Sequence, residues 1–210
     1  MPVVLSQGYK KAQKKEDRDF LQKQLQKALI YEKRFGKPIY YKGYEEVLKG
    51  KLPLEAVMVS SLLHAFLIDL IVTFLKKFLK SQKYIVLYGE VGFKFAKSSW
   101  YNIDIGIWEK EKVKSQLFED KMATIAPKVV IEIDTKADVK KFGSFEEYVN
   151  IKIKDLLESG VEKVVWIFTT SKKILVAEKD KDWIITDWNK EISILEGVQI
   201  NLEKLVNEVK

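Results

Sequence analysis

The chain has 210 residues, of which 47% are hydrophobic, enough to bury one core of ordinary size and to exclude extended disorder. It has no cysteine, which excludes disulfides and thiolate catalysis, and no apolar leader is apparent, so we expect a cytoplasmic protein. The net charge is +7, and residues 1–37 carry +6 of it, with ten Lys or Arg against four Asp or Glu. This basic N-terminal arm favours binding of a polyanion such as nucleic acid, and a solvated helix face is the plainer alternative.

The first part of the chain has the period of a helix. Helices are expected over residues 15–34 and 44–48. The apolar stretch over residues 54–80 is long enough to raise a membrane span, but His64 and Asp69 interrupt it. It therefore predicts a long core helix, and no membrane partner is expected.

From residue 83 onward hydrophobic and polar residues alternate with the period of two that is typical of strands, with one amphipathic helix between the later strands. Strands are expected over 84–88, 91–96, 100–108, 128–136, 163–168, 173–177 and 183–187, and helices over 144–158 and 201–209. This order predicts an α/β domain over residues 38–210, a mixed sheet flanked by helices with a long helix before it.

The stretch Lys128–Lys136 is the first candidate for a site. Its β-branched composition indicates a buried strand, and alternation places Glu132 and Asp134 on one face, joined by Lys136 if the strand runs that far. Burying carboxylates without a partner is costly. The sequence therefore requires a compensating cation, which is either a metal ion or a lysine of the chain.

Two further residues are expected to meet these carboxylates. Asp104 lies on the polar-marked face of the strand over 100–108, which should pair with the central strand. Lys152 falls on the core-facing stripe of the helix over 144–158. Carboxylates held together repel, and Mg²⁺ or Mn²⁺ is the usual ion that keeps them ionised. The alternative is that each carboxylate pairs with a nearby lysine.

Three segments resemble one known family. They are PKVVIEI at residues 127–133, KIKDLLESGV at 152–161 and VVWIF at 164–168. They are similar to the Uma-two family of predicted restriction endonucleases, in the PD-(D/E)XK phosphodiesterase superfamily, and the resemblance extends over residues 40–205. It implies a restriction-endonuclease-like core and hydrolysis of nucleic-acid phosphodiester bonds with Mg²⁺ or Mn²⁺.

By this resemblance, Asp104 and Glu132 stand at the metal-binding positions and Lys152 at the family's lysine, displaced onto the helix. Asp134 occupies the place of the superfamily's motif lysine, which departs from the pattern. Two alternatives stay open. Asp134 is a candidate third metal ligand, and Lys136 competes with Lys152 for the lysine role.

The expected function is a Mg²⁺-dependent endonuclease acting on DNA, with Asp104, Glu132 and Lys152 as its catalytic residues. The metal lowers the pKa of a bound water, and Lys152 positions that water and stabilises the transition state. A protein of the same fold that binds nucleic acid without cleaving it is the main alternative. A third is an interaction protein whose basic arm contacts another protein or a membrane surface. A homodimer is compatible with the sequence.

Overall fold

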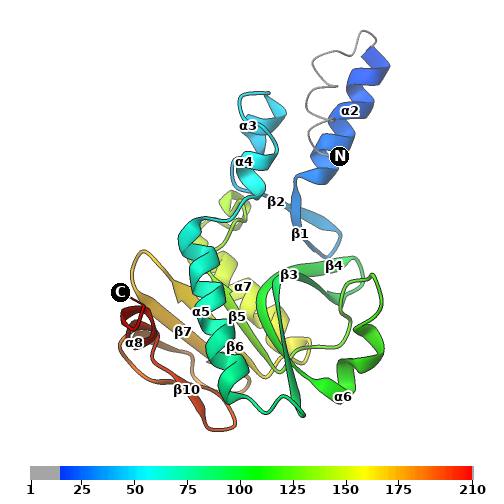
Figure 1. The fold of residues 1–210 in the computed structure, drawn as a ribbon. Coiled ribbons are helices and arrows are strands. Elements are labelled where there is room, and N and C mark those ends of the chain that lie inside the picture. Colours follow the sequence, from blue (N-terminus) through cyan, green and yellow to red (C-terminus); the bar gives the residue numbers. More distant parts are fainter. Residues whose placement is uncertain (1–14, 210) are drawn as a thin grey trace.

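A mixed β-sheet forms the centre of the computed structural model, which describes residues 15–209 (Figure 1). The helices are α2 (Lys15–Ala28), α3 (Tyr44–Leu48), α4 (Glu55–Met58), α5 (Leu62–Phe78), α6 (Lys110–Val113), α7 (Phe145–Glu158) and α8 (Leu202–Asn207), with short 3-10 turns at Lys114–Gln116 and Lys140–Phe142. The strands are β1 (Ile30–Arg34), β2 (Lys37–Tyr40), β3 (Tyr84–Ala96), β4 (Ser99–Glu109), β5 (Val129–Ile133), β6 (Lys163–Phe168), β7 (Lys173–Glu178), β8 (Ile184–Asp187), β9 (Ile192–Leu195) and β10 (Val198–Ile200).

In the described part of the chain the main sheet has eight strands, in the order β2-β1-β4-β5-β6-β7-β8, with β3 paired to β4. Strands β5 and β6 are parallel, and α7 is the crossover that such a pair needs. The neighbouring pairs β4–β5 and β6–β7 are antiparallel, so the sheet is mixed. The predicted fold class is confirmed: a mixed central sheet flanked by helices, with a long helix before it.

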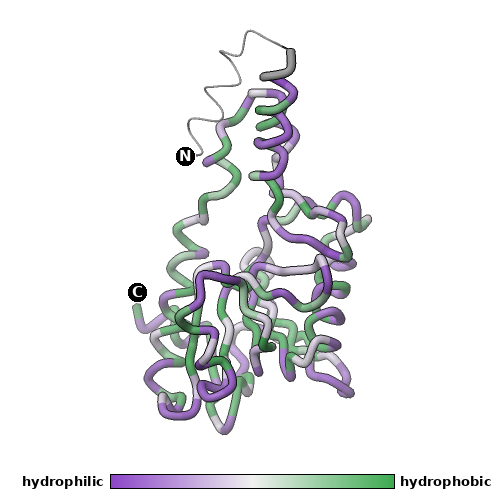
Figure 2. The backbone as a smooth tube through the Cα atoms, turned by 90° about the vertical axis from the view of Figure 1, so that its right-hand side faces the viewer, coloured by the Kyte–Doolittle hydropathy of each residue, from purple (hydrophilic) through white to green (hydrophobic). Residues whose placement is uncertain are grey.

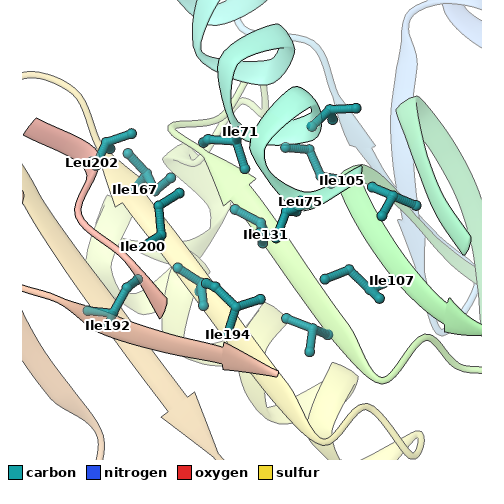
Figure 3. Close-up of a cluster of buried hydrophobic side chains, with 14 of the residues drawn as sticks. Ile71, Leu75, Ile105, Ile107, Ile131, Ile167, Ile192, Ile194, Ile200 and Leu202 are labelled. Atoms are coloured by element: carbon teal, nitrogen blue, oxygen red, sulfur yellow. The ribbon is translucent and has the colours of Figure 1, made fainter. Parts of the chain in front are cut away.

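Both faces of the sheet are covered. On one face α5, α8 and the β9–β10 hairpin pack on the sheet, and Ile71 and Leu75 of α5 meet its isoleucines (Figure 3). On the other face α7 packs through residues such as Leu156. In β5, Val130 belongs to the core under α7. Since alternate residues of a strand share a face, Glu132 also points toward α7.

The helix predicted over residues 15–34 is wrong at its C-terminal end. Helix α2 ends at Ala28, and Ile30–Arg34 forms β1, which pairs with both β2 and β4. A turn with positive φ at Phe35 and Gly36 closes the hairpin of β1 and β2. Strand pairing in the sheet therefore decides the structure of this segment, although its apolar residues have helical spacing. Residues 30–37 of the predicted N-terminal arm therefore lie in the sheet, and residues 1–14 lie outside the described residues.

The long apolar segment is divided rather than continuous. Val59 takes an extended conformation after α4, and the Ser61 side chain then caps α5 by accepting the His64 N–H at 3.2 Å. The two strands predicted over 84–88 and 91–96 form the single bulged strand β3. The β9–β10 hairpin was not predicted. No described helix is both long and apolar enough to cross a membrane.

Helices α2, α3 and α4 lie at the end of the molecule beyond the β1–β2 hairpin, as two views at right angles show (Figures 1 and 2). A small separate core holds them to the hairpin, made by Leu25, Leu29, Val47 and Leu54. Helix α2 is therefore fixed against β2, although most of its surface faces away from the sheet.

Candidate active site

The candidate site lies where β1 and β5 separate along one edge of β4, between Trp100 and Ile105, and we call this place the fork. Strand β4 pairs with β3 along one edge. On its other edge it pairs with β5 through residues 105–107, and with β1 only at Trp100. Between these two pairings the edge of β4 at Asn102 meets no strand, so its backbone groups must find other partners. Charged side chains take the place of the missing strand.

Asp104 lies where β4 parts from β5. It is buried, and its Oδ2 accepts the Ile133 backbone N–H at 2.8 Å, in place of a strand-to-strand hydrogen bond. A bulge in β3 places two residues opposite Asp104, between the pairs Tyr88–Ile105 and Val91–Ile103. On either side of Asp104, Ile103 belongs to the core under α7 and Ile105 to the core under α5. Strict alternation along β4 would place these two isoleucines on one face.

Lys152 reaches the fork from α7. Its side chain is 1% exposed, and Nζ lies 3.1 Å from Glu132 Oε2, so the structure brings these two predicted residues together. Nζ also donates to the Asn102 carbonyl oxygen at 2.9 Å, which satisfies one of the unpaired groups of β4. The rings of Tyr101 and Trp166 lie 5.3 Å and 5.6 Å from Nζ and exclude water from it.

Glu32 is a site residue that sequence reasoning missed, because it lies in a segment predicted to be helical. Its side chain is fully buried, and Oε1 accepts from Lys152 Nζ at 2.8 Å and from the Asn102 N–H at 3.1 Å. Oε2 accepts the Tyr148 hydroxyl at 2.7 Å. A lone glutamate between Tyr31 and a basic run was the only signal available in the sequence.

The fork contains more carboxylate groups than cationic groups, since among the described residues Lys152 alone faces both Glu32 and Glu132. Burial raises the pKa of Glu132 well above its ordinary value, and the charge of Lys152 offsets this only in part. Burial also raises the pKa of Glu32, and the charge of Lys152 again lowers it only in part. For Lys152, burial acts to lower the pKa, but Glu132 and Glu32 outweigh it and raise the pKa above its ordinary value. Lys152 therefore stays charged, and the glutamates retain an affinity for a proton or another cation.

His64 approaches Asp104 from the first turn of α5. Its Nε2 lies 3.2 Å from Asp104 Oδ2, and this hydrogen bond raises the pKa of the imidazole. The other ring nitrogen, Nδ1, is buried and has no partner among the described residues. The sequence marked His64 as an interruption of an apolar helix and gave it no role at the site.

The two remaining candidates have other partners. Strand β5 ends at Ile133, and Asp134 follows with a φ of 50°, which turns its carboxylate toward Thr169, whose backbone N–H lies 3.0 Å from Oδ1. Lys136 pairs with Glu90, on the bulge of β3. The structure thus places Lys152, and not Lys136, against Glu132.

The described residues of the fork that could hold a metal are two carboxylates, Asp104 and Glu132. Glu132 Oε1 is buried without a hydrogen-bond partner, and no described residue donates to Asp104 Oδ1. Mg²⁺ keeps several waters and commonly takes only one or two carboxylates from a protein, so these two oxygens suit it. The described residues include no group of three or more His, Asp or Glu side chains placed to hold a metal. The predicted third ligand, Asp134, is not brought into such a group.

Comparison with known proteins shows a likeness to a solved structure. No family model matches the chain, and no curated protein matches it. Among solved structures, it is similar to a putative nuclease belonging to DUF820 from Anabaena variabilis ATCC 29413, with a TM-score of 0.62 and 14% sequence identity. The likeness covers 84% of this chain and 89% of the other. At this identity it shows a nuclease-like fold and no more, and membership of the Uma-two family stays a prediction.

Proposed function

We propose that the chain is a metal-dependent phosphodiesterase that cleaves nucleic acid, with DNA as its substrate. The observation that carries the proposal is a pair of carboxylate oxygens without donors, Asp104 Oδ1 and Glu132 Oε1, near a buried lysine in the fork of the sheet. The pKa of Glu132 is raised well above its ordinary value by burial, and a strongly perturbed carboxylate in such a position is characteristic of a functional site. The likeness of the fold to that of a putative nuclease supports the same class of reaction by analogy.

Asp104 and Glu132 would hold the Mg²⁺ or Mn²⁺ ion. When bound, such an ion supplies a water of lowered pKa and neutralises charge on the scissile phosphate. The chain fixes each ligand through its other oxygen: the Ile133 N–H holds Asp104 Oδ2, and Lys152 Nζ holds Glu132 Oε2. Both carboxylates are therefore oriented before any ion arrives.

The geometry gives Lys152 a positioning role. Its Nζ donates hydrogen bonds to Glu32 and to the Asn102 carbonyl, and it forms an ion pair with Glu132. Lys152 therefore orients Glu132 and favours its ionised form against the effect of burial, and contact with an attacking water requires the loss of one of these contacts. Glu32 and its Tyr148 partner hold the lysine in place.

Plasmid cleavage tests the proposal. The protein should nick a supercoiled plasmid in Mg²⁺ or Mn²⁺ and not in EDTA, and Asp104→Asn and Glu132→Gln should each lower the rate at least about a hundredfold. Asp187→Asn is the matched control, since Asp187 is an exposed carboxylate paired with Lys173 on β7. Equal cleavage in EDTA, or an undiminished rate for Asp104→Asn, would refute it.

The second candidate is a nucleic-acid-binding protein of the same fold that does not cleave. The burial of Lys152 against Glu32, Glu132 and the Asn102 carbonyl favours it, because a catalytic lysine must contact water or phosphate. DNA binding by the purified protein, with no cleavage in either metal ion, would select this candidate.

A further inference from the structure

Two cavities meet at Tyr40, on the side of β1 and β2 away from α5. The larger, of about 480 Å³, lies between the β1–β2 hairpin, the loop that follows β5, and α7. The smaller, of about 340 Å³, lies between α2 and the same hairpin. Tyr40 lines both cavities, and we call the two cavities together the Tyr40 groove.

The polar lining of the Tyr40 groove is mainly cationic. Its charged residues are Lys23, Lys27, Arg34, Lys37, Lys140 and Lys141, against Glu45, Asp138 and Glu147. Lys140 lies 3.8 Å from Glu45, and Arg34 is bound to Asp155. The other four lysines form no ion pair with a carboxylate of the described residues, so their charge is available to an anion.

Stacked aromatic rings form the wall of the groove. Tyr40 stacks on Tyr44 with ring centroids 4.5 Å apart and planes 15° apart. Lys141 Nζ lies 5.3 Å from the centroid of the Tyr40 ring. Lys141 is exposed and carries no ion pair, so its ammonium can leave this ring for a phosphate. Aromatic platforms beside free cations are the arrangement with which proteins hold unpaired nucleotides.

The other large cavity has the opposite polar character. It measures about 550 Å³, lies beside Trp183, and is lined by the carboxylates of Asp134 and Glu146. The cation that the described lining contributes, Lys173, is bound to Asp187. An anionic polymer is therefore repelled there, and the sign of the charge favours the Tyr40 groove.

Helix α7 connects the groove to the fork. Glu147 and Ile151 line the groove, whereas their neighbours Tyr148 and Lys152 reach Glu32 inside the fork. The two sites therefore lie on adjacent faces of one helix.

We propose that the Tyr40 groove binds an unpaired stretch of nucleic-acid strand and guides it to the fork. This assignment rests on the proposed function, because it takes nucleic acid as the ligand. A base stacks on Tyr40 where the Lys141 ammonium now lies, and Lys141 and Lys37 contact the flanking phosphates. Lys23 and Lys27 of α2 continue this track of cations along the strand.

Binding measured without metal tests the groove. A fluorescent single strand of about 12 nucleotides is titrated in EDTA, with anisotropy as the readout. Tyr40→Leu should weaken binding about tenfold, whereas Tyr40→Phe, which keeps the ring, should bind like the unmodified protein. The double variant Lys37→Met/Lys141→Met should make the logarithmic salt dependence shallower by about 1.4, the value for two phosphate contacts on a single strand. Lys190→Met, an exposed lysine before β9, is the control.

Three results would overturn the assignment: unchanged binding by a folded Tyr40→Leu, an unchanged salt slope for the double lysine variant, or tighter binding of the matching duplex than of the strand. Equal affinity for a free mononucleotide would also overturn it. Because no cleavage is involved, the two proposals fail separately. Normal strand binding with no cleavage in metal removes the phosphodiesterase alone. Cleavage together with unchanged binding by Tyr40→Leu removes the groove alone.

Discussion

Replacing Lys152 by methionine separates the cation of the fork from its packing. Methionine keeps most of the length and the apolar stem of lysine, so the space between Tyr101 and Trp166 stays filled. What is lost is the charge that faces Glu32 and Glu132, and within the described residues no other lysine or arginine forms an ion pair with either glutamate.

The expected loss of stability follows from the contacts. Nζ lies 2.8 Å from Glu32 and 3.1 Å from Glu132. At an effective dielectric constant of about 20, each contact contributes roughly 5–6 kcal/mol of attraction. Much of this only offsets the desolvation of the lysine. Removing one partner of a buried pair typically costs about 3–5 kcal/mol, and we expect a loss of this size at pH 8.

The loss should depend on pH with a definite sign. The folded-state pKa of each glutamate is raised above the ordinary value of 4.5, and removing Lys152 raises both further. A carboxylate whose pKa is higher in the folded than in the unfolded protein stabilises the folded state fully when the pH is below its unfolded-state pKa. This stabilisation is lost as the pH rises through its folded-state pKa. The deficit of the variant should therefore be smallest near pH 4.5 and grow by up to about 1.4 kcal/mol per pH unit for each retained proton.

Urea denaturation in EDTA between pH 4.5 and pH 8 measures this dependence. Lys154→Met is the control, because Lys154 is an exposed lysine two residues along the same helix. A deficit under about 1 kcal/mol at pH 8 would show that the buried pairs contribute little net stability. A large deficit that does not vary with pH would attribute the loss to packing. Either result refutes the electrostatic account of the fork.

Three further outcomes are expected. Glu132→Gln should abolish cleavage yet melt no lower than wild type in EDTA, because Glu32 still pairs with Lys152. The gain in the free energy of unfolding, about 1 kcal/mol, should grow between pH 5 and pH 8. A large drop in melting temperature would show a structural salt bridge instead. Tyr148→Phe should cost about 1–3 kcal/mol in chemical denaturation by leaving a buried oxygen of Glu32 without its donor, and a neutral effect would contradict this. Gly106→Ala should lower the melting temperature sharply, at a cost of about 3 kcal/mol, because a Cβ there would lie 2.2 Å from the Trp108 ring; wild-type melting would refute the clash.

Local patterns in the sequence predicted the elements that lie inside the core. The apolar stripe of α7 placed Lys152 on the buried face, and the β-branched run of β5 placed Glu132 toward that same helix. Both inferences need only the periods of 3.6 and 2 and a decision about which side is buried. That is why these two residues meet in the structure as the spacing indicated.

The positions of Glu32 and Asp134 could not be predicted in this way. Glu32 reaches the fork because β1 folds back beside β4, a long-range pairing that overrides a helical pattern in the sequence. Asp134 lies one residue beyond the end of β5, where alternation no longer applies and the backbone takes a positive φ. Strand parity predicts orientation only for as long as the strand continues.

The fork also explains why charged residues are buried here at all. If β4 continued its ladder with β5, the Asn102 N–H and carbonyl would pair with backbone, and Glu32 and Lys152 would have nothing to replace. Because the strands part, each of these groups instead meets a charged side chain, at 3.1 Å and 2.9 Å. The charge of Lys152 thus satisfies the backbone of the fork and, through Glu132, orients a carboxylate whose other oxygen stays without a donor. Stability and the proposed metal binding therefore depend on different atoms of one cluster, which is why Lys152→Met should destabilise the protein whereas Glu132→Gln should only inactivate it.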